Sequence, residues 1–114
     1  MDDAFIVSGK ETGAPDGADL SVRIAGDELE PYIMRGGTAF AARTRSVADG
    51  EVGIFLVEGR MLCRQFCEDA AGNVYLFTVN RRRKKADVTV PAAKRDRIFC
   101  FGRVILPPIP LPRE

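Results

Sequence analysis

The chain has 114 residues, 46% of them apolar and 29% charged, which suits a single small domain with one hydrophobic core. Seventeen lysines and arginines against sixteen acids leave a net charge of +1, so bulk charge is not expected to draw the chain to nucleic acid or to a membrane surface. The sequence contains no histidine, which removes the commonest general base near neutral pH and the commonest nitrogen ligand for zinc.

The N-terminal stretch is acidic and lacks the positively charged start of a signal peptide, and no window approaches the about 18 apolar residues of a membrane-spanning helix. We therefore expect a cytoplasmic protein with no membrane partner. Three cysteines are an odd number, which does not suggest a disulfide framework. We expect small buried apolar roles for Cys63, Cys67 and Cys100, and neither a metal site nor a cofactor.

The sequence predicts a flexible leader at 1–19, a folded domain at 20–106 and a proline-rich tail at 107–114. The leader is assigned because its second half is rich in Gly, Asp and Ser. From Leu20 to Ile24 apolar and polar residues alternate, the period-two pattern of a half-buried strand. Residues 28–34 then predict one short turn of helix.

The rest of the domain is expected to be mainly β, with six or seven short strands in all. Further extended segments are predicted at 38–43, 52–57, 61–67, 73–79, 87–90 and 97–106. The best hairpin joins 52–57 to 61–67 through Glu58 and Gly59. The tail contains four of the seven prolines, so it is expected to be extended and to lie over its own domain; docking into a partner's groove is the alternative.

Arg64 stands where the predicted strand 61–67 should carry apolar residues, because Leu62, Arg64 and Phe66 share one parity. If that face is the core face, the guanidinium needs a carboxylate partner, since an unpaired buried charge is costly. The alternative is that Arg64 extends to water along its aliphatic stem. The candidate partners are three acids of one short segment, Asp27, Glu28 and Glu30.

These clustered acids also suggest paired carboxylates for glycoside hydrolysis. No aromatic sugar platform surrounds them, however, and acids near a turn or a helix start usually act as caps or are solvated. The hydrolase hypothesis therefore has no second support.

Five segments occur in an order and spacing that resemble a known family. They are residues 26–31 (GDELEP), 49–55 (DGEVGIF), 63–66 (CRQF), and the late stretches 72–80 and 101–105. Together they resemble the C-terminal domain of LexA and phage repressors, a self-cleaving serine peptidase whose core is shared with signal peptidases. The resemblance covers about residues 20–106 and implies a partly coiled β-sheet.

The resemblance places the family's nucleophilic serine on Glu28 and its general-base lysine on Arg64. Arginine stays protonated and a carboxylate is a poor nucleophile toward an amide, so neither residue can perform the family's chemistry. We therefore expect no catalytic residue, and we expect Glu28 and Arg64 to form an ion pair in place of the reactive dyad. The family's scissile Ala-Gly bond is also missing from a suitable position, since Ala25-Gly26 lies inside the motif and Ala71-Gly72 in a hairpin loop.

The first functional hypothesis is a catalytically inactive dimerisation and regulatory module of a bacterial or phage transcription regulator. Family members form homodimers, and DNA would be read only by a helix-turn-helix domain that these 114 residues do not contain. We expect an exposed late strand to pair across the two-fold axis, with Phe99, Phe101 and Ile105 buried between subunits; purely internal packing of this strand is the alternative.

Two other functions remain open. A residual peptidase would need Thr38 or Ser46 as nucleophile, with a base chosen from Lys84, Lys85 and Lys94. Direct nucleic-acid binding would use a run of five cations, Arg81, Arg82, Arg83, Lys84 and Lys85. A solvated loop is the alternative explanation of that run, and any binding should be weak and should fall steeply with salt.

Overall fold

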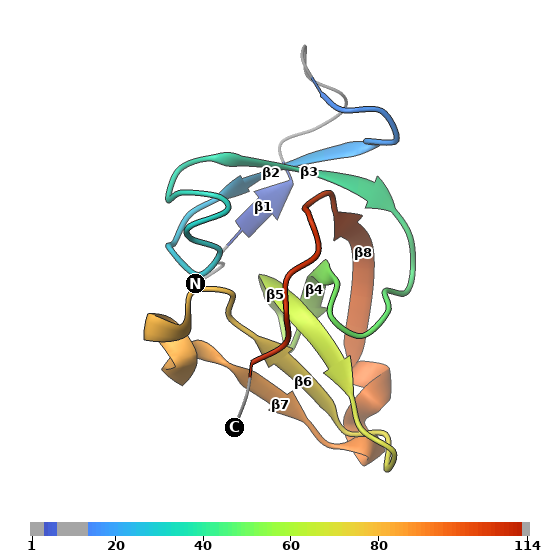
Figure 1. The fold of residues 1–114 in the computed structure, drawn as a ribbon. Helices are drawn as coiled ribbons and strands as arrows, with labels where there is room; N and C mark the ends of the chain where they lie inside the picture. Colours follow the sequence, from blue (N-terminus) through green and yellow to red (C-terminus); the bar gives the residue numbers. More distant parts are fainter. Residues whose placement is uncertain (1–3, 7–13, 113–114) are drawn as a thin grey trace.

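The computed structural model describes residues 4–6 and 14–112, which form one antiparallel sheet of eight strands and two short 3-10 helices (Figure 1). In chain order the elements are β1 (Ala4–Ile6), β2 (Leu20–Ile24), β3 (Thr38–Arg43), β4 (Val52–Val57), β5 (Arg60–Glu68), β6 (Val74–Phe77), η1 (Arg81–Ala86), β7 (Val88–Val90), η2 (Ala92–Arg97) and β8 (Ile98–Val104). Across the sheet the order is β1-β2-β3-β8-β4-β5-β6-β7. The predicted mainly β fold is confirmed.

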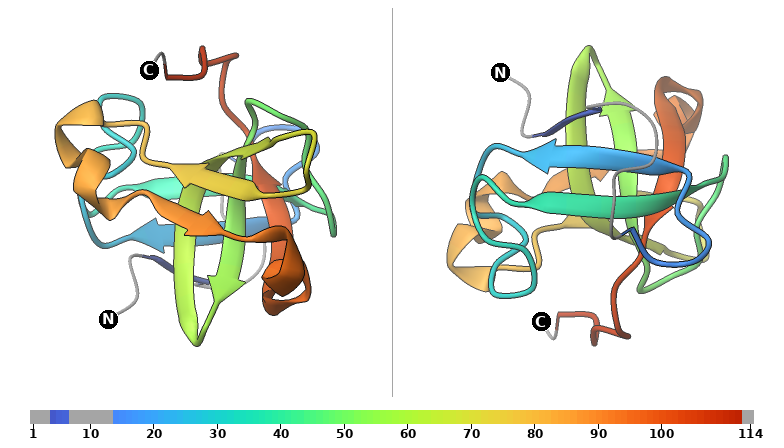
Figure 2. Two further views of the ribbon diagram at one scale, coloured as in Figure 1. Left: turned by 90° about the horizontal axis from the view of Figure 1, so that it is seen from below. Right: turned by 90° about the horizontal axis from the view of Figure 1, so that it is seen from above.

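The sheet is strongly coiled, so that β2 and β3 cross over the β4–β5 hairpin (Figure 2) and β1 lies against β5. Coiling creates two hydrophobic clusters on opposite faces of the hairpin. The first cluster gathers buried residues of β2 and β3 with Ile54 and Cys63. The second gathers buried residues of β6 and β7 with Phe55 and Leu62. Alternate residues of β4 and β5 therefore point into different clusters.

Strand β5 is buried on both faces from Leu62 to Phe66. Leu62 and Phe66 pack in the second cluster, as their shared parity predicted, while Cys63 packs in the first. Arg64 lies between Leu62 and Phe66 along that parity and is 1% exposed. The predicted core face is thus correct, and the alternative in which the Arg64 side chain reaches water is wrong.

The hairpin between β4 and β5 turns where the sequence predicted it. Glu58 and Gly59 have φ angles of 49° and 82°, the left-handed pair that a two-residue turn needs to match the twist of the flanking strands. The turn fixes Val57 opposite Arg60 and so sets the register of the whole pair. Residues 28–34 form the single turn that the sequence predicted: the Leu29 carbonyl accepts the backbone N–H groups of Tyr32 and Ile33, and no longer helix follows.

The segment expected to be a flexible leader takes part in the fold. Strand β1 pairs with β2, Ala18 is buried, and the Asp19 backbone N–H donates to the Ala41 carbonyl at 2.8 Å. Backbone pairing holds these residues although their composition favours a loop. Residues 7–13 of the expected leader lie outside the described residues.

Strand β8 is not an exposed edge, which corrects the expectation that it pairs across a two-fold axis. It lies between β3 and β4, and from Gly102 to Val104 it is paired with β3 while from Ile98 to Arg103 it is paired with β4. The backbone groups of its second half are therefore used inside the subunit.

A bulge in β8 also separates the three residues expected to form one interface. The register shifts between Ile54 and Phe55, so that Phe101 is the extra residue opposite β4. Phe101 packs against the first cluster and contacts Phe99 at a centroid distance of 4.7 Å, so the two rings share a face. Val104 is paired opposite Ala41, and both residues belong to the first cluster. Because successive residues of an extended chain point to opposite faces of the sheet, the next residue, Ile105, points away from that cluster.

The proline-rich tail crosses its own domain (Figure 1), and Leu106 and Ile109 pack against the first cluster. Gln65, 1% exposed, fixes it in place: its Nε2 donates to the Ile109 carbonyl at 2.8 Å and to the Gly50 carbonyl at 3.0 Å. The expected intramolecular course of the tail is confirmed over residues 107–112.

Replacing Gln65 by Met should lower the free energy of unfolding by about 1–3 kcal/mol, because carbonyl groups of Gly50 and Ile109 lose a buried donor. The measurement is the midpoint of urea unfolding. Glu68→Gln, at the exposed end of the same strand, is the control and should leave the midpoint nearly unchanged. Equal midpoints for both variants would show that Gln65 does not anchor the tail.

Candidate functional site

The loop after β2 carries the GDELEP segment and is fixed to the body by main-chain contacts. Leu29 is fully buried in the first cluster. The Glu28 carbonyl accepts the backbone N–H groups of Val79 and Asn80, both at 2.9 Å, and the Asn80 side-chain amide donates to the Asp27 carbonyl at 3.0 Å. The loop is therefore held against the segment that joins β6 to η1.

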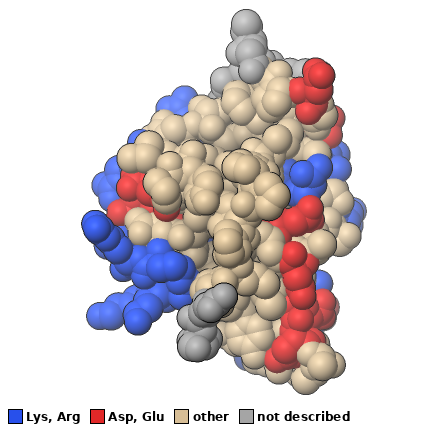
Figure 3. Space-filling view, viewed as in Figure 1, with Lys and Arg blue, Asp and Glu red and all other residues tan. Residues whose placement is uncertain are grey.

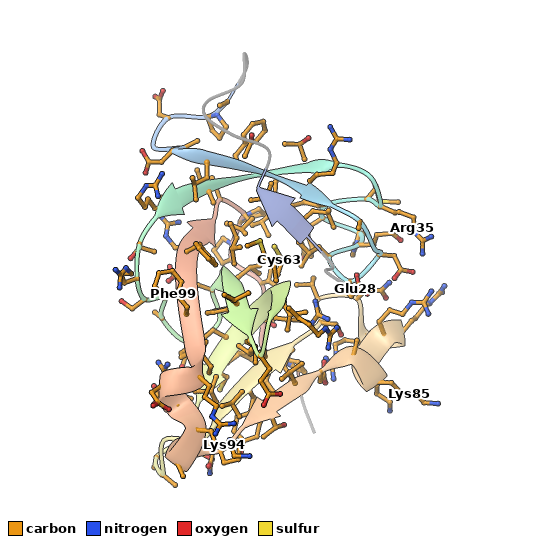
Figure 4. The ribbon with its side chains drawn as sticks, turned by 180° about the vertical axis from the view of Figure 1, so that it is seen from behind. Glu28, Arg35, Cys63, Lys85, Lys94 and Phe99 are labelled. Atoms are coloured by element: carbon orange, nitrogen blue, oxygen red, sulfur yellow. The ribbon has the colours of Figure 1, made fainter. Side chains whose placement is uncertain are left out.

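The Glu28 side chain turns back over its own loop. Its carboxylate rests against the α-carbon of Gly26, in the space that a β-carbon would occupy. The Glu28 Oε1 atom is buried and has no hydrogen-bond partner. In Figure 4, Glu28 lies on the same side of the molecule as Arg35 and Lys85.

The expected ion pair between Glu28 and Arg64 is not formed, which corrects the sequence-based prediction. Arg64 donates from Nη1 to the Cys63 carbonyl at 2.9 Å and from Nε to the Ala86 carbonyl at 3.3 Å. No hydrogen bond or ion pair joins it to Glu28, although both residues are described. The physical reason is that carbonyl oxygens lie within reach of the guanidinium on β5, while the Glu28 carboxylate is turned over Gly26.

The acid that does form an ion pair in this loop is Asp27. Its two carboxylate oxygens accept from Nε of Arg83 at 2.9 and 3.0 Å, and Arg35 approaches to 4.0 Å. The hydrogen bond from Arg83 is the main cause that lowers the pKa of Asp27 below its ordinary value, and the positive charges of Arg83 and Arg35 act in the same direction. Glu30 accepts from the Arg35 backbone N–H at 3.1 Å.

A second ion pair fixes the start of η1. Arg81 binds Asp87 through two parallel contacts, Nη1 to Oδ1 and Nη2 to Oδ2, each 3.0 Å long, and its guanidinium lies over the Phe77 ring. The Asp87 carboxylate also accepts the backbone N–H of Thr78 at 2.8 Å. Together with Arg83–Asp27, this pair attaches the basic segment to the β6–β7 region and to the GDELEP loop.

These residues surround an open cleft of about 510 Å³. It is lined by Gly26, Asp27, Glu28, Arg35, Arg82, Arg83, Lys84, Lys85 and Ala86. Arg82, Lys84 and Lys85 are exposed on η1, and Arg35 faces them from the loop that follows β2. The structure thus brings the run of cations and the GDELEP segment into one site.

The residues considered for a residual peptidase do not join this arrangement as a pair. Thr38 begins β3, Ser46 lies in an exposed loop where its backbone groups contact Thr44, and Lys94 is exposed on η2. Lys84 and Lys85 line the cleft but are also exposed. No hydrogen bond joins either hydroxyl to any of the three lysines, all of which are described.

The cysteines do not supply a nucleophile. Cys63 and Cys100 are buried, Cys67 is half-buried, and all three are free thiols. Burial is the main cause that raises the pKa of Cys100 and of Cys67, and for Cys67 the charges of Asp49 and Asp69 add to it. Within residues 4–6 and 14–112, no group of three or more cysteines and acids is placed to hold a metal ion.

Sequence reasoning missed three contributors to the site: Arg35, Asp87 and the pairing of Arg83 with Asp27. Arg35 and Asp87 had no pattern to distinguish them from solvated charges. Asp27 and Arg83 are far apart in the chain, so only the fold brings them together. The side-chain oxygen of Asn80 accepts the backbone N–H of Arg82 and so caps the start of η1. Asparagine is a preferred residue at this position, so Asn80 is a local signal that could have predicted where η1 begins.

The comparisons with known proteins agree with the resemblance. A family model described as Peptidase S24-like matches residues 2–105. A search of curated proteins returns no match. In the described part of the chain, no helix has the length and apolar character that crossing a membrane requires.

A double-mutant cycle tests whether Glu28 and Arg64 interact. We expect Glu28→Gln to change the free energy of unfolding by less than about 0.5 kcal/mol, and Arg64→Met to lower it by about 1.5–3 kcal/mol because charged hydrogen bonds to buried carbonyls are lost. The double variant should be additive within about 0.5 kcal/mol.

Asp27→Asn combined with Arg83→Gln is the positive control, since these two side chains are in contact and should show measurable coupling. A coupling energy above about 1 kcal/mol between positions 28 and 64 would mean that the two charges interact directly in solution.

Proposed function

Because the chain belongs to the Peptidase S24-like family, we propose that it is a catalytically inactive member that serves as a dimerising regulatory domain of a bacterial or phage transcription regulator. The observation that carries the proposal is the state of Arg64. It occupies the position that the resemblance gives to the general-base lysine, it is 1% exposed, and backbone carbonyls accept its N–H groups.

The chemistry of this position argues against proton transfer. A general base must lose its own proton to accept one from the nucleophile, and burial can hold a lysine in the neutral form. A guanidinium remains protonated even when buried, and it carries donors only.

The position of the nucleophile supports the same proposal. Glu28 carries a carboxylate in place of a hydroxyl, and one of its oxygens is buried against the loop rather than presented to the cleft. A carboxylate attacking an amide would form an anhydride and expel an amine, a much poorer route than attack by an activated hydroxyl. Together with Arg64 on β5, this arrangement of Glu28 supports the proposal that the domain has no peptidase activity.

The proposed association surface is the aromatic face of β8. Phe99 is 39% exposed, the Phe101 ring meets it edge-to-face, and the Arg45 guanidinium lies 4.7 Å from the Phe99 centroid. A dimer formed here would pack side chains face to face, and would not extend the sheet, because β8 already has neighbours. Ile105 follows the end of β8, on the opposite side of the chain from Val104, and is left out of the proposed surface.

Incubating the purified protein at alkaline pH, the condition that favours a lysine base, should leave a single intact species by mass spectrometry. The expected result follows because neither Glu28 nor Arg64 can supply the peptidase reaction. A folded control that is cleaved under the same conditions by added protease shows that fragments would be detected. Two fragments from the protein alone would instead support a residual peptidase with other catalytic groups.

Replacing Phe99 by Ser should shift the protein from dimer to monomer in sedimentation velocity experiments, because it removes the exposed aromatic anchor from the proposed surface. Tyr32→Ser is the matched control, since Tyr32 is a comparably exposed aromatic side chain (44%) far from β8 in the sequence, in the loop after β2. A wild-type monomer at micromolar concentration, or equal effects of both variants, would contradict dimerisation through β8.

A further inference from the structure

We propose that the cleft between η1 and the loop after β2 binds the sugar-phosphate backbone of a nucleic acid, through four exposed cations whose side chains make no hydrogen bond to a carboxylate; Arg35 approaches Asp27 only to 4.0 Å. The four cations are Arg35, Arg82, Lys84 and Lys85. The proposal is separate from the dimerising role of β8 and does not depend on whether the domain has lost peptidase activity.

The first step is to count which charges of the basic run remain available. Arg81 is held by Asp87 through two 3.0 Å contacts, and Arg83 by Asp27 at 2.9 and 3.0 Å. These two ion pairs fasten η1 to the body, although the Arg83 side chain is itself 52% exposed. Arg81 and Arg83 are structural cations, and they present their neighbours on a fixed backbone.

The second step is the geometry of the remaining cations. Arg82, Lys84 and Lys85 project from η1, and Arg35, with 64% of its side chain exposed, lines the same cleft from the opposite wall. In Figure 4, Arg35 and Lys85 lie on the same side of the molecule, with Glu28 between them. In Figure 3, the blue side chains gather at the corner occupied by η1. The charge is therefore concentrated at one corner, although the whole chain has a net charge of only +1.

The third step concerns the two acids that line the cleft, Asp27 and Glu28. Their negative charges would repel an anionic ligand if they were not compensated. Asp27 is neutralised by Arg83, and Glu28 has one carboxylate oxygen buried against Gly26. Five cations and two acids line the cleft, so an anion entering it meets an excess of positive charge.

The composition of the cleft favours a nucleic acid over an acidic peptide. Its lining contains no apolar side chain larger than that of Ala86, so it offers no pocket in which a peptide could bury an anchor residue. A phosphate backbone needs no such anchor, because counterion release by lysine and arginine supplies the affinity. The cleft also carries no aromatic side chain, so base stacking and sequence preference are not expected.

The test is the fluorescence anisotropy of a labelled DNA duplex of about 20 base pairs, titrated with the full chain over a range of salt concentrations. Four phosphate contacts predict a slope of about −3.6 in a plot of log K against log salt, which is on the order of a hundredfold loss of affinity between about 50 and 200 mM salt. At physiological salt the dissociation constant should fall in the range of about 10⁻⁴–10⁻⁶ M.

The decisive variant replaces Arg35, Arg82, Lys84 and Lys85 by Gln, and should abolish measurable binding. The matched control replaces four exposed cations elsewhere, Arg23, Arg43, Lys94 and Arg97, by Gln, and so removes the same net charge. It should bind within about threefold of wild type if the cleft is the site. Circular dichroism checks that both variants are folded, and Lys85→Gln alone should reduce the salt slope by about 1 in magnitude.

Three outcomes would overturn the proposal. Absence of binding at about 50 mM salt would show that the cleft does not hold phosphates. Equal weakening by the cleft variant and the control would assign the binding to diffuse surface charge. Tighter binding of labelled poly-glutamate than of DNA at equal ionic strength would identify an acidic polypeptide as the occupant. These results are distinguishable from those of the cleavage and dimerisation experiments, because cleavage is measured on the unaltered chain and none of the altered residues belongs to β8.

Discussion

The burial of β5 on both faces is the constraint on which the rest of the structure depends. All residues from Leu62 to Phe66 are buried, with Leu62 and Phe66 in the second cluster and Cys63 in the first, so both faces of the β4–β5 hairpin must be covered. A flat single sheet cannot cover both faces of its own central strands, whereas a coiled one can. The chain therefore brings β2 and β3 across one face and curls β6 and β7 toward the other (Figure 2).

The same constraint explains how a charged side chain is tolerated at position 64. A buried guanidinium must have its donors satisfied, but the acceptors do not have to be carboxylates. The carbonyl of Cys63 on the same strand and that of Ala86 at the end of η1 both accept from it. The sequence predicted a carboxylate partner for Arg64 from the loop after β2, and none of Asp27, Glu28 and Glu30 has that role. The Ala86 carbonyl could not be predicted as an acceptor, since its position depends on where η1 ends in space.

Local patterns predicted most of the strands because turn residues bound them and because they are either alternating in polarity, as at 20–24, or continuously apolar, as at 52–57. The segments 38–43 and 52–57 have the bounds that the sequence indicated. Strand β1 was missed because three residues are too few to show a period. The position of β8 inside the sheet and its bulge at Phe101 depend on partners distant in the chain, which no local pattern reports. The same limit hid the pairing of Asp27 with Arg83.

The loop that carries Glu28 is held by groups that do not depend on the side chain at that position. Leu29 anchors it in the core, the Glu28 carbonyl accepts two backbone N–H groups, and Asn80 binds the Asp27 carbonyl. Main-chain bonds of this kind form with any residue at position 28, so the reacting group can change while the loop keeps its shape. The shape of this loop therefore depends on Leu29, on Asn80 and on main-chain groups, and the side chain at position 28 can change at little cost in stability.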